Sequence, residues 1–467
     1  MNRVLLFILF LAPLWAIGQN ARDSRQLLQE LDFAQLPASF FLQTHNLEPR
    51  TRQPLDPAAP VELTLRPGKL DFDHATPFIA FSAAWEEERP DAENTRLWIS
   101  FSSDETNWSE WQAIEPDPHA VEIRHSFASE LYFLEPGIRY YRIRIRANET
   151  GKGMGMKKLL VNFFSPGQPL TEEPVSPLEH TALAPDTCAL PVVVTRAQWN
   201  CPQTVTSHSK TTVTHLIVHH AAGPNTSSDW GATVLSIWNY HVNTNGWADV
   251  GYNWLIAPNG QLFEGRGGGD NIVGAHFCGK NSGTMGICML GTYTSVQITD
   301  AARKTLTDVL AWKASKLVLD PLGKSYHATS ALTLDHISGH RDGCSTECPG
   351  TQLYSILPEI RIAVKDRISS CNLITALPEI PGLDYLEIAP NPAGAGEAAI
   401  RLSLRYPSEV GYRIFSPEGR LVAESAPATL QGETRLPLSG LNGVAPGLYQ
   451  VQVWIDNKPA VLKLALF

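Results

Sequence analysis

Short segments that alternate between polar and apolar residues dominate the first third of the chain. In 97–101 the first, third and fifth residues are large and apolar, and 141–146 alternates an apolar residue with arginine three times in succession. A period of two places one face of a strand against a core and the other toward solvent. Because no long helical pattern interrupts these segments, we expect residues 19–164 to form an all-β sandwich.

The pattern changes in the middle of the chain. A short apolar segment at 214–218 predicts a strand, and from Val234 to His241 bulky residues recur at the spacing of one helix face. Ser, Ser and Asp at 227–229 are typical residues for the start of that helix.

Further helices and a hairpin are predicted downstream. The turn sequence Pro-Asn-Gly at 258–260 lies between two apolar runs, which is typical of a β-hairpin. Apolar spacing predicts a second helix that starts near Thr299 and a third over about 358–368. Strands mixed with helices make residues 188–371 an α/β domain, for which we expect a mixed sheet with flanking helices.

Alternation returns near the end of the chain. Residues 384–467 contain several apolar runs of period two and frequent turn residues, which predict a second, small β-sandwich. Two proline-rich stretches, 165–187 and 372–383, separate the three predicted domains and are interpreted as linkers. The chain is therefore expected to be multidomain.

The first residues have the layout of a secretory signal peptide. One arginine precedes an almost unbroken apolar run over 4–17, and small residues occupy the positions before a possible cleavage site at Gln19. The run is short for a membrane-spanning helix. We expect residues 1–18 to be removed on export through the inner membrane, and the mature chain to have no transmembrane anchor.

Composition narrows the classes of partner. The 467 residues include 37 Lys and Arg against 47 Asp and Glu, so the formal net charge is −10. An acidic chain is a poor candidate for nucleic-acid binding, which depends on clustered basic residues. The 43% hydrophobic content and 12 Trp exclude a mostly disordered protein.

Export changes the interpretation of the cysteines. An exported chain forms disulfides, and an odd number leaves one thiol for another role. Three disulfides and one metal thiolate fit the count, although the sequence does not determine the pairing. The seven are Cys188, Cys201, Cys278, Cys288, Cys344, Cys348 and Cys371.

Two features of the chain have competing explanations. The arginines of 141–146 could contact an acidic polymer or form a solvated strand face, and Trp108 and Trp111 could stack on sugars or pack internally. The glycine-rich segment 265–269 suggests a phosphate loop, but 270–274 shows no helical pattern after it, so we reject a nucleotide site.

Two segments carry the candidate chemistry. An apolar strand ends in the pair His219 and His220, and the later segment 337–350 contains His340 and Cys348. Two imidazoles and one thiolate form a three-ligand zinc set with a fourth position open for water, as in catalytic sites. Taken singly, such a histidine could be a satisfied core residue, and Cys348 could belong to a disulfide.

Together with other signatures, these segments resemble a known family. Asp-Val-Gly-Tyr-Asn at 249–253, Gly-His-Arg-Asp at 339–342 and Thr-Glu-Cys-Pro-Gly at 346–350 follow the histidine pair in order. They resemble the zinc-dependent N-acetylmuramoyl-L-alanine amidases of the peptidoglycan recognition protein family. The segments 195–199, 264–267 and 274–276 are also similar to family signatures, so the resemblance covers roughly 188–371.

The resemblance implies a role for each matching residue. His219, His340 and Cys348 are expected to bind Zn²⁺, while Tyr252 and Thr346 match catalytic positions. Because a phenol is a weak base at neutral pH, we expect Tyr252 to donate a hydrogen bond and position water, with a proton-shuttle role left open. Residues expected to line the substrate groove or support the ligands are His220, Arg266, His276 and Asn281.

The implied reaction is hydrolysis of the amide between N-acetylmuramic acid and L-alanine, with bacterial peptidoglycan, its glycan strand and stem peptide, as partner. The alternative is a recognition protein that binds peptidoglycan without cutting it, but such members typically lack the cysteine matching Cys348. An unrelated zinc peptidase is disfavoured because the chain has no His-Glu-x-x-His motif. Cys344, four residues before Cys348, departs from the family pattern: a disulfide there would stiffen the ligand loop, whereas competition for the metal would change the ligand set.

The last domain also resembles a known one. Pro-Asn-Pro at 390–392, Ser-Pro-Glu-Gly-Arg at 416–420 and the segments 438–441 and 446–449 resemble the C-terminal sorting domain of type IX secretion substrates in Bacteroidota. The resemblance implies the type IX secretion machinery as a partner and a secreted or cell-surface location. The alternative is a carbohydrate-binding or adhesive β-domain.

Overall fold

The protein is described from a computed structural model. The expected signal peptide 1–18, most of 165–187 and part of 372–383 lie outside the described residues. The structure describes residues 22–45, 61–72, 75–87, 95–117, 127–147, 155–168, 188–202, 209–373, 380–394, 396–416 and 420–466.

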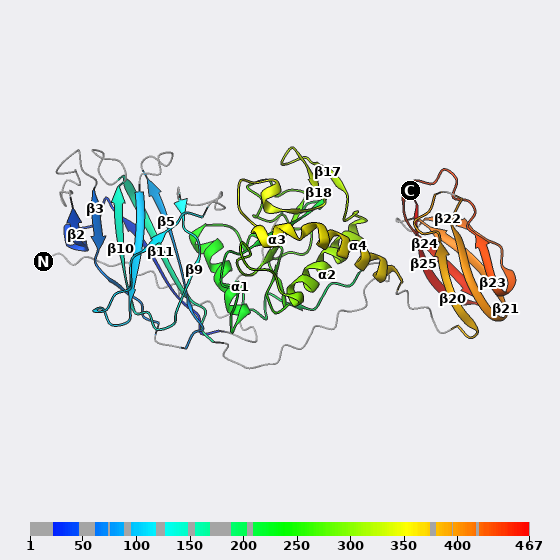
Figure 1. Ribbon diagram of the computed structural model, residues 1–467, viewed down its shortest axis with the longest axis horizontal. Helices are drawn as coiled ribbons and strands as arrows, with labels where there is room; N and C mark the ends of the chain where they lie inside the picture. Colours follow the sequence, from blue (N-terminus) through cyan, green and yellow to red (C-terminus); the bar gives the residue numbers. More distant parts are fainter. Residues whose placement is uncertain are drawn as a thin grey trace.

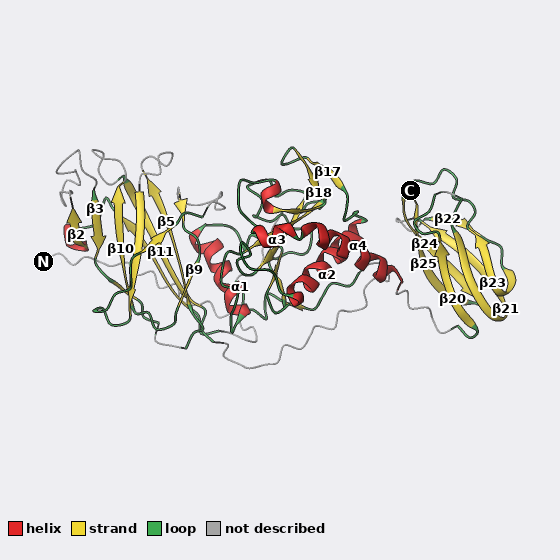
Figure 2. Ribbon diagram, in the orientation of Figure 1, coloured by secondary structure: helices red, strands yellow, loops and turns green. Residues whose placement is uncertain are grey.

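The N-terminal unit consists of two antiparallel sheets that face each other (Figures 1 and 2). One sheet has the order β1-β11-β5-β8 with β9 on β5, and the other has the order β2-β3-β10-β6-β7 with β4 on β10. Its elements are β1 (Arg25–Asp32), η1 (Ala38–Phe40), β2 (Phe41–His45), β3 (Glu62–Leu65), β4 (Gly68–Lys69), β5 (Ile79–Glu87), β6 (Thr95–Ser102), β7 (Gln112–Ile114), β8 (Phe127–Ala128), β9 (Tyr132–Leu134), β10 (Tyr140–Ala147) and β11 (Met156–Ser165).

Alternation along the strands builds this sandwich. Ile143 and Ile145 of β10 are 1% and 0% exposed and face the rings of Phe81 and Phe163 on the other sheet within one core. The two phenylalanine rings lie 4.8 Å apart between centroids. The period-two pattern therefore correctly predicted a buried face on β10.

The arginines on the other face of β10 are covered by the two tryptophans. The guanidinium of Arg142 lies 4.4 Å from the ring centre of Trp108 and 4.7 Å from that of Trp111, and Arg144 lies 4.1 Å from Trp111. This interleaved cation–π ladder holds the loop after β6 against the sheet. The two tryptophans are half-buried and stack on these arginines, as the packing explanation expected.

The central unit is a six-stranded mixed sheet with helices on both faces (Figure 2). The order is β12-β15-β14-β16-β13-β19, in which only the β14–β15 pair is antiparallel. A separate hairpin of β17 and β18 was not expected from the sequence. The strands are β12 (Val193–Val194), β13 (His215–His220), β14 (Trp254–Ile256), β15 (Leu262–Glu264), β16 (Thr284–Met289), β17 (Lys324–His327), β18 (Leu332–Asp335) and β19 (Ile337–Gly339).

The helices largely follow the predicted pattern. The first helix is capped by the side chain of Asp229, within the predicted cap segment 227–229. The second helix begins next to Thr299, as predicted, and the side chain of Thr299 caps it. A one-turn helix before the last one was not predicted. The helical elements are α1 (Trp230–Asn239), η3 (Tyr240–Thr244, π-helical), α2 (Asp300–Leu317), η4 (His340–Asp342), α3 (Thr351–Ser355) and α4 (Leu357–Leu373).

Strand β13 separates two cores. Leu216 and Val218 point to the side covered by α2 and α4, where they join one hydrophobic cluster. His219 is on the opposite face, because successive side chains of a strand alternate. A disulfide between Cys188 and Cys371 links the start of this unit to α4.

The C-terminal unit is built around one long strand. Strand β21 (Ala399–Phe415) pairs with β20 over 399–404, with β23 over 399–410, with β24 over 410–415 and with β22 over 413–415. All six strands therefore form one connected sheet around a single core. The strands are β20 (Leu383–Ala389), β21 (Ala399–Phe415), β22 (Leu421–Glu424), β23 (Ala428–Pro437), β24 (Gly447–Ile455) and β25 (Lys458–Leu466). Within the described residues, no helix combines the length and apolar character needed to cross a bilayer.

Candidate metal centre

Strand register places His219 and His340 side by side. Val218 of β13 pairs with Gly339 of β19 in a parallel ladder, so the residues that directly follow these two lie at the same edge of the sheet. These residues are His219 and His340, and their ring centres are 4.5 Å apart. The carboxyl ends of parallel strands are a common position for binding sites in α/β folds.

Cys348 reaches the same point from the loop after η4. Its Sγ lies 3.7 Å from Nδ1 of His219 and accepts the backbone N–H of His220 at 3.4 Å. The ligand atoms of His219, His340 and Cys348 all lie within 4.8 Å of one another, and the three residues are buried. Burial raises the pKa of the Cys348 thiol to about 12.

Short hydrogen bonds hold the ligand loop in this position. The backbone N–H of Arg341 donates to the carbonyl of Cys348 at 3.0 Å, which closes the loop between the two ligands. The carboxylate of Asp342 accepts the N–H of Gly339 at 2.8 Å and the hydroxyl of Tyr354 at 2.5 Å. The Gly-His-Arg-Asp signature therefore also contains the residue that anchors the turn at His340.

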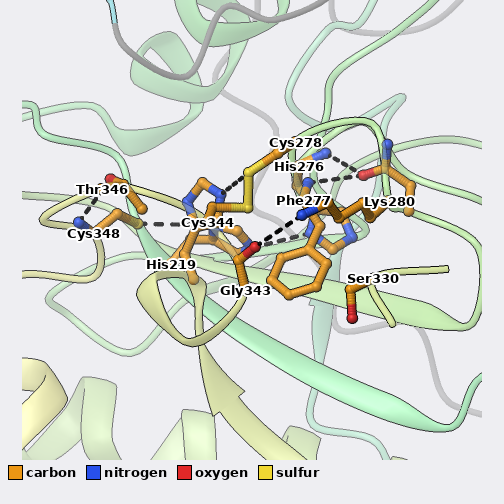
Figure 3. Close-up of a disulfide and its surroundings, with 12 residues drawn as sticks. His219, His276, Phe277, Cys278, Lys280, Ser330, Gly343, Cys344, Thr346 and Cys348 are labelled. Carbon is orange, nitrogen blue, oxygen red and sulfur yellow. Dashed lines mark hydrogen bonds between the residues drawn. A yellow bond between two sulfur atoms is a disulfide. The ribbon is translucent and has the colours of Figure 1, made fainter. Parts of the chain in front are cut away.

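A disulfide joins this loop to a second loop of the site (Figure 3). Cys344 bonds to Cys278, and Sγ of Cys278 lies 3.7 Å from Nε2 of His340. Lys280 adds a hydrogen bond of 3.3 Å to the carbonyl of Gly343, so the two loops are linked twice. In this form Cys344 is not a free thiolate beside the metal ligands.

The cysteine count had allowed three disulfides, and two are formed within the described residues. The bonds use Cys188, Cys371, Cys278 and Cys344. Of the others, Cys288 is buried next to the candidate catalytic tyrosine.

Tyr252 lies beside the three ligands. Its ring centre is 5.2 Å from that of His219, and its hydroxyl interacts with the thiol of Cys288. Burial, followed by the charges of Cys288 and Cys348, raises the pKa of Tyr252 well above its usual range. The phenol therefore keeps its proton at neutral pH, as a hydrogen-bond donor requires.

His276 lies behind His219. Its Nδ1 is 3.0 Å from Nε2 of His219, so the two rings share a hydrogen bond while Nδ1 of His219 faces Cys348. Burial, with a smaller effect of Arg266, lowers the pKa of His276 to about 3. Such a partner fixes the tautomer and ring orientation of a ligand histidine.

The remaining predicted residues take varied positions around the centre. Asn281 accepts the backbone N–H groups of residues 276 and 277 at 2.7 and 2.8 Å, so it shapes the loop that carries His276. Thr346 accepts the N–H of Cys348 at 3.0 Å. Arg266 donates to the carbonyl of Val250 at 3.2 Å.

His220 lies on the other face of β13 from His219. Its Nδ1 accepts the backbone N–H of Tyr293 at 3.3 Å. Because neighbouring side chains of a strand alternate, the two histidines of the pair cannot both turn toward the same centre.

Buried ionic contacts explain another part of the sequence pattern. Arg196, from the segment 195–199, forms a 3.1 Å ion pair with Asp249 and donates to the carbonyl of Gly265 at 2.6 Å. Asp249 is fully buried and also accepts the N–H of Gly267 at 3.0 Å. This network joins three family-like segments and holds the loop that leads to Tyr252.

Sequence reasoning did not identify two residues next to the site. His241 accepts the N–H of Gly251 at 3.2 Å, and its ring centre lies 5.7 Å from that of Tyr252. Tyr240 precedes it and contacts the N-terminal unit. The helical spacing placed His241 on a buried face, but it carried no information about these contacts.

The same part of the chain matches a known protein family. The family model described as N-acetylmuramoyl-L-alanine amidase matches residues 209–351, which contain all three candidate ligands. Peptidoglycan-recognition protein SC2 of Drosophila simulans is 32% identical over 167 residues, which are 35% of this chain and 83% of that protein. The chain belongs to the peptidoglycan-recognition protein and amidase family.

Other members of this family also match about a third of the chain. The human N-acetylmuramoyl-L-alanine amidase is 35% identical over 160 residues, which are 32% of this chain and 25% of that protein. The crystal structure of the Drosophila peptidoglycan recognition protein SD has 23% identity and a TM-score of 0.31, and the alignment covers 36% of this chain and 93% of that one. The residues matched by the family model lie within the central unit.

Proposed function

We propose that this protein is a zinc-dependent N-acetylmuramoyl-L-alanine amidase that hydrolyses the bond between N-acetylmuramic acid and L-alanine in peptidoglycan. The observation that carries the proposal is the convergence of His219, His340 and Cys348 next to Tyr252. The names of the amidase family and of the human relative support the reaction class.

The three candidate ligands fit zinc. Two imidazoles and a thiolate are donors that zinc prefers, and three protein ligands are typical of a catalytic zinc site with one position for water or substrate. The donor atoms lie within 4.8 Å of one another, which is compatible with one shared ion. Nδ1 of His219 faces Cys348, while its Nε2 is already engaged by His276.

The chain's own residues supply orientation and hydrogen bonds for the reaction. When bound, zinc polarises the scissile carbonyl and lowers the pKa of a water molecule toward neutrality. Tyr252 keeps its proton because burial raises its pKa, so its hydroxyl is suited to donate to the oxygen that becomes negative. The hydroxyl of Thr346 accepts the backbone N–H of Cys348. We propose that the same hydroxyl donates a second hydrogen bond to this oxygen.

The alternative is recognition without hydrolysis. Several relatives are named peptidoglycan-recognition proteins, and those names do not state an amidase activity. Both functions require peptidoglycan binding, and only hydrolysis requires the three candidate ligands. We therefore expect the choice between the two functions to depend on Cys348.

The proposed location of the protein rests on segments outside the metal centre. We propose export by the signal peptide 1–18 and sorting by residues 384–467, with 19–164 and 188–371 as the domains that reach the outside. The sequence signatures support this route. In a type IX-competent host, deletion of 384–467 should abolish secretion. The purified protein that lacks 384–467 but keeps the N-terminal and central units should retain its activity.

Digestion of purified peptidoglycan tests the proposed activity. Mature protein should release stem peptides with a new L-alanine amino terminus, detected by mass spectrometry, and a chelator should abolish the release until zinc is added back. Cys348→Ser should bind peptidoglycan without cutting it, whereas the matched control Cys201→Ser should cut normally. Wild-type protein that binds the wall and releases no peptide at any zinc concentration would establish recognition instead.

A further inference from the structure

The N-terminal sandwich and the central unit share a continuous core. Ala80 of β5 and Phe164 of β11 belong to the same hydrophobic cluster as Trp230, Val234 and Trp238 of α1. Figure 1 shows α1 lying against these strands. Loosely attached domains usually meet through smaller, more polar surfaces.

A buried polar network crosses the same boundary. Asn162 of β11 donates to Oδ1 of Asn239 and Oγ1 of Thr244, both at 2.9 Å. Ser82 of β5 lies 2.7 Å from the hydroxyl of Thr244. These four residues are at most 2% exposed, and each of them forms a buried hydrogen bond to the other domain.

The contacts converge on the π-helical segment η3. The hydroxyl of Tyr240, its first residue, lies 2.7 Å from Oδ2 of Asp117 and 2.7 Å from the carbonyl oxygen of Ser129. Both partners belong to the N-terminal unit, and Tyr240 itself is 5% exposed. A π-helical turn within a helix frequently occurs at functional sites.

From Tyr240 a short series of contacts leads to the candidate centre. The neighbouring His241 accepts the N–H of Gly251 at 3.2 Å and stacks on Trp247, with ring centres 4.6 Å apart. Gly251 directly precedes Tyr252, whose ring contacts both His241 and His219. The position of the phenol thus depends on where η3 lies.

We propose that Tyr240 is a positioning residue through which the N-terminal sandwich holds Tyr252 in place for the reaction. The sandwich is then part of the catalytic unit rather than a separate binding module. The expected change in kcat rests on the proposed amidase function, whereas the expected effect of Tyr240 on the position of Tyr252 rests on the structure alone.

The variant Tyr240→Phe in the full chain tests the kinetic consequence. It removes the hydroxyl that Asp117 and Ser129 hold, and we expect kcat to fall about tenfold with KM within about twofold and zinc content unchanged, because small displacements of a reacting group are costly. Asp117→Ala should act in the same way, whereas Asp117→Asn retains an oxygen acceptor and should preserve kcat. Tyr141→Phe is the matched control, because its hydroxyl bonds to Gln29 within the sandwich.

Hydrogen exchange on the same full-length variants separates the inference from the activity. Amides of 245–254 should exchange several-fold faster in Tyr240→Phe and Asp117→Ala than in wild type and Tyr141→Phe, with or without substrate. Wild-type exchange together with unchanged kcat in both variants would overturn the positioning role. If the wild-type protein proves to bind without cutting, the proposed activity fails, and the exchange measurement still decides whether Tyr240 positions Tyr252.

Discussion

The side chains of His219 and His276 form one unit, with Nε2 of the first 3.0 Å from Nδ1 of the second. The sequence suggested a place for His276 in the groove or behind the ligands, and the structure puts its ring behind His219. The second ring N–H of a zinc-bound histidine generally donates a hydrogen bond to a carboxylate or carbonyl oxygen. Here a buried imidazole occupies that position.

Replacing His276 should therefore weaken metal binding. We expect His276→Ala to bind zinc about 10- to 100-fold more weakly, because His219 loses the partner that fixes its tautomer. Competition with a chelating dye measures the affinity directly. His336→Gln, a change in the β17–β18 hairpin region, should leave the affinity unchanged, and equal affinities for all three proteins would show that His276 has no such role.

The disulfide between Cys278 and Cys344 should matter for the metal as well as for stability. Replacing both of its cysteines with serine is expected to lower zinc affinity, since the loop before Cys348 loses its link to the loop of Cys278. Closing 66 residues also stabilises the fold by about 4 kcal/mol in the chain-entropy model. Thermal unfolding and zinc titration are measured on the same samples.

The second disulfide provides the control for this experiment. The double variant Cys188→Ser with Cys371→Ser opens a larger loop, of 183 residues. Stability should fall at least as much as for the first disulfide, while zinc affinity stays constant. Parallel losses of affinity in both double variants would mean that the metal site responds only to global stability.

Removal of the Tyr252 hydroxyl should affect the reaction and not the metal. In Tyr252→Phe we expect kcat to fall by about 10²- to 10³-fold, as for loss of one donor to a developing oxyanion. Zinc content and peptidoglycan binding should remain those of wild type. A variant that retains full activity would assign the donor role to another residue.

Stability should decrease on acidification because of His241. Burial, and to a lesser extent the charge of Arg266, lowers its pKa to about 3, whereas the unfolded chain titrates near 6.5. The contribution of neutral His241 to the free energy of unfolding is therefore complete above pH 6.5 and is lost as the pH falls toward 3. One such group lowers the free energy of unfolding by about 2 kcal/mol between pH 6.5 and pH 5.

Denaturant unfolding at several pH values measures this slope. His241→Asn, which retains an acceptor for the N–H of Gly251, should flatten the decrease between pH 6.5 and pH 5. An unchanged slope would assign the acid sensitivity to other groups, among them His215, whose pKa is lowered chiefly by burial.

Much of the local structure could be predicted from nearest neighbours in the chain. Asp229 and Thr299 cap their helices, and the Pro-Asn-Gly turn joins β14 and β15, because these interactions span only a few residues. The β17–β18 hairpin and α3 were missed, since their short segments carry little periodicity.

The donor types of the candidate site, and the strand-rich or mixed character of each domain, could be predicted from the sequence alone. His219, His340 and Cys348 were identifiable because donor type and order along the chain are properties of the sequence, and strand alternation follows from a fixed backbone period. The tertiary structure decided which groups meet. The Cys278–Cys344 bond, the place of His276 behind His219, and the contact of Tyr240 with Asp117 join residues far apart in the chain. Such contacts depend on sheet register and domain packing, which no local pattern encodes.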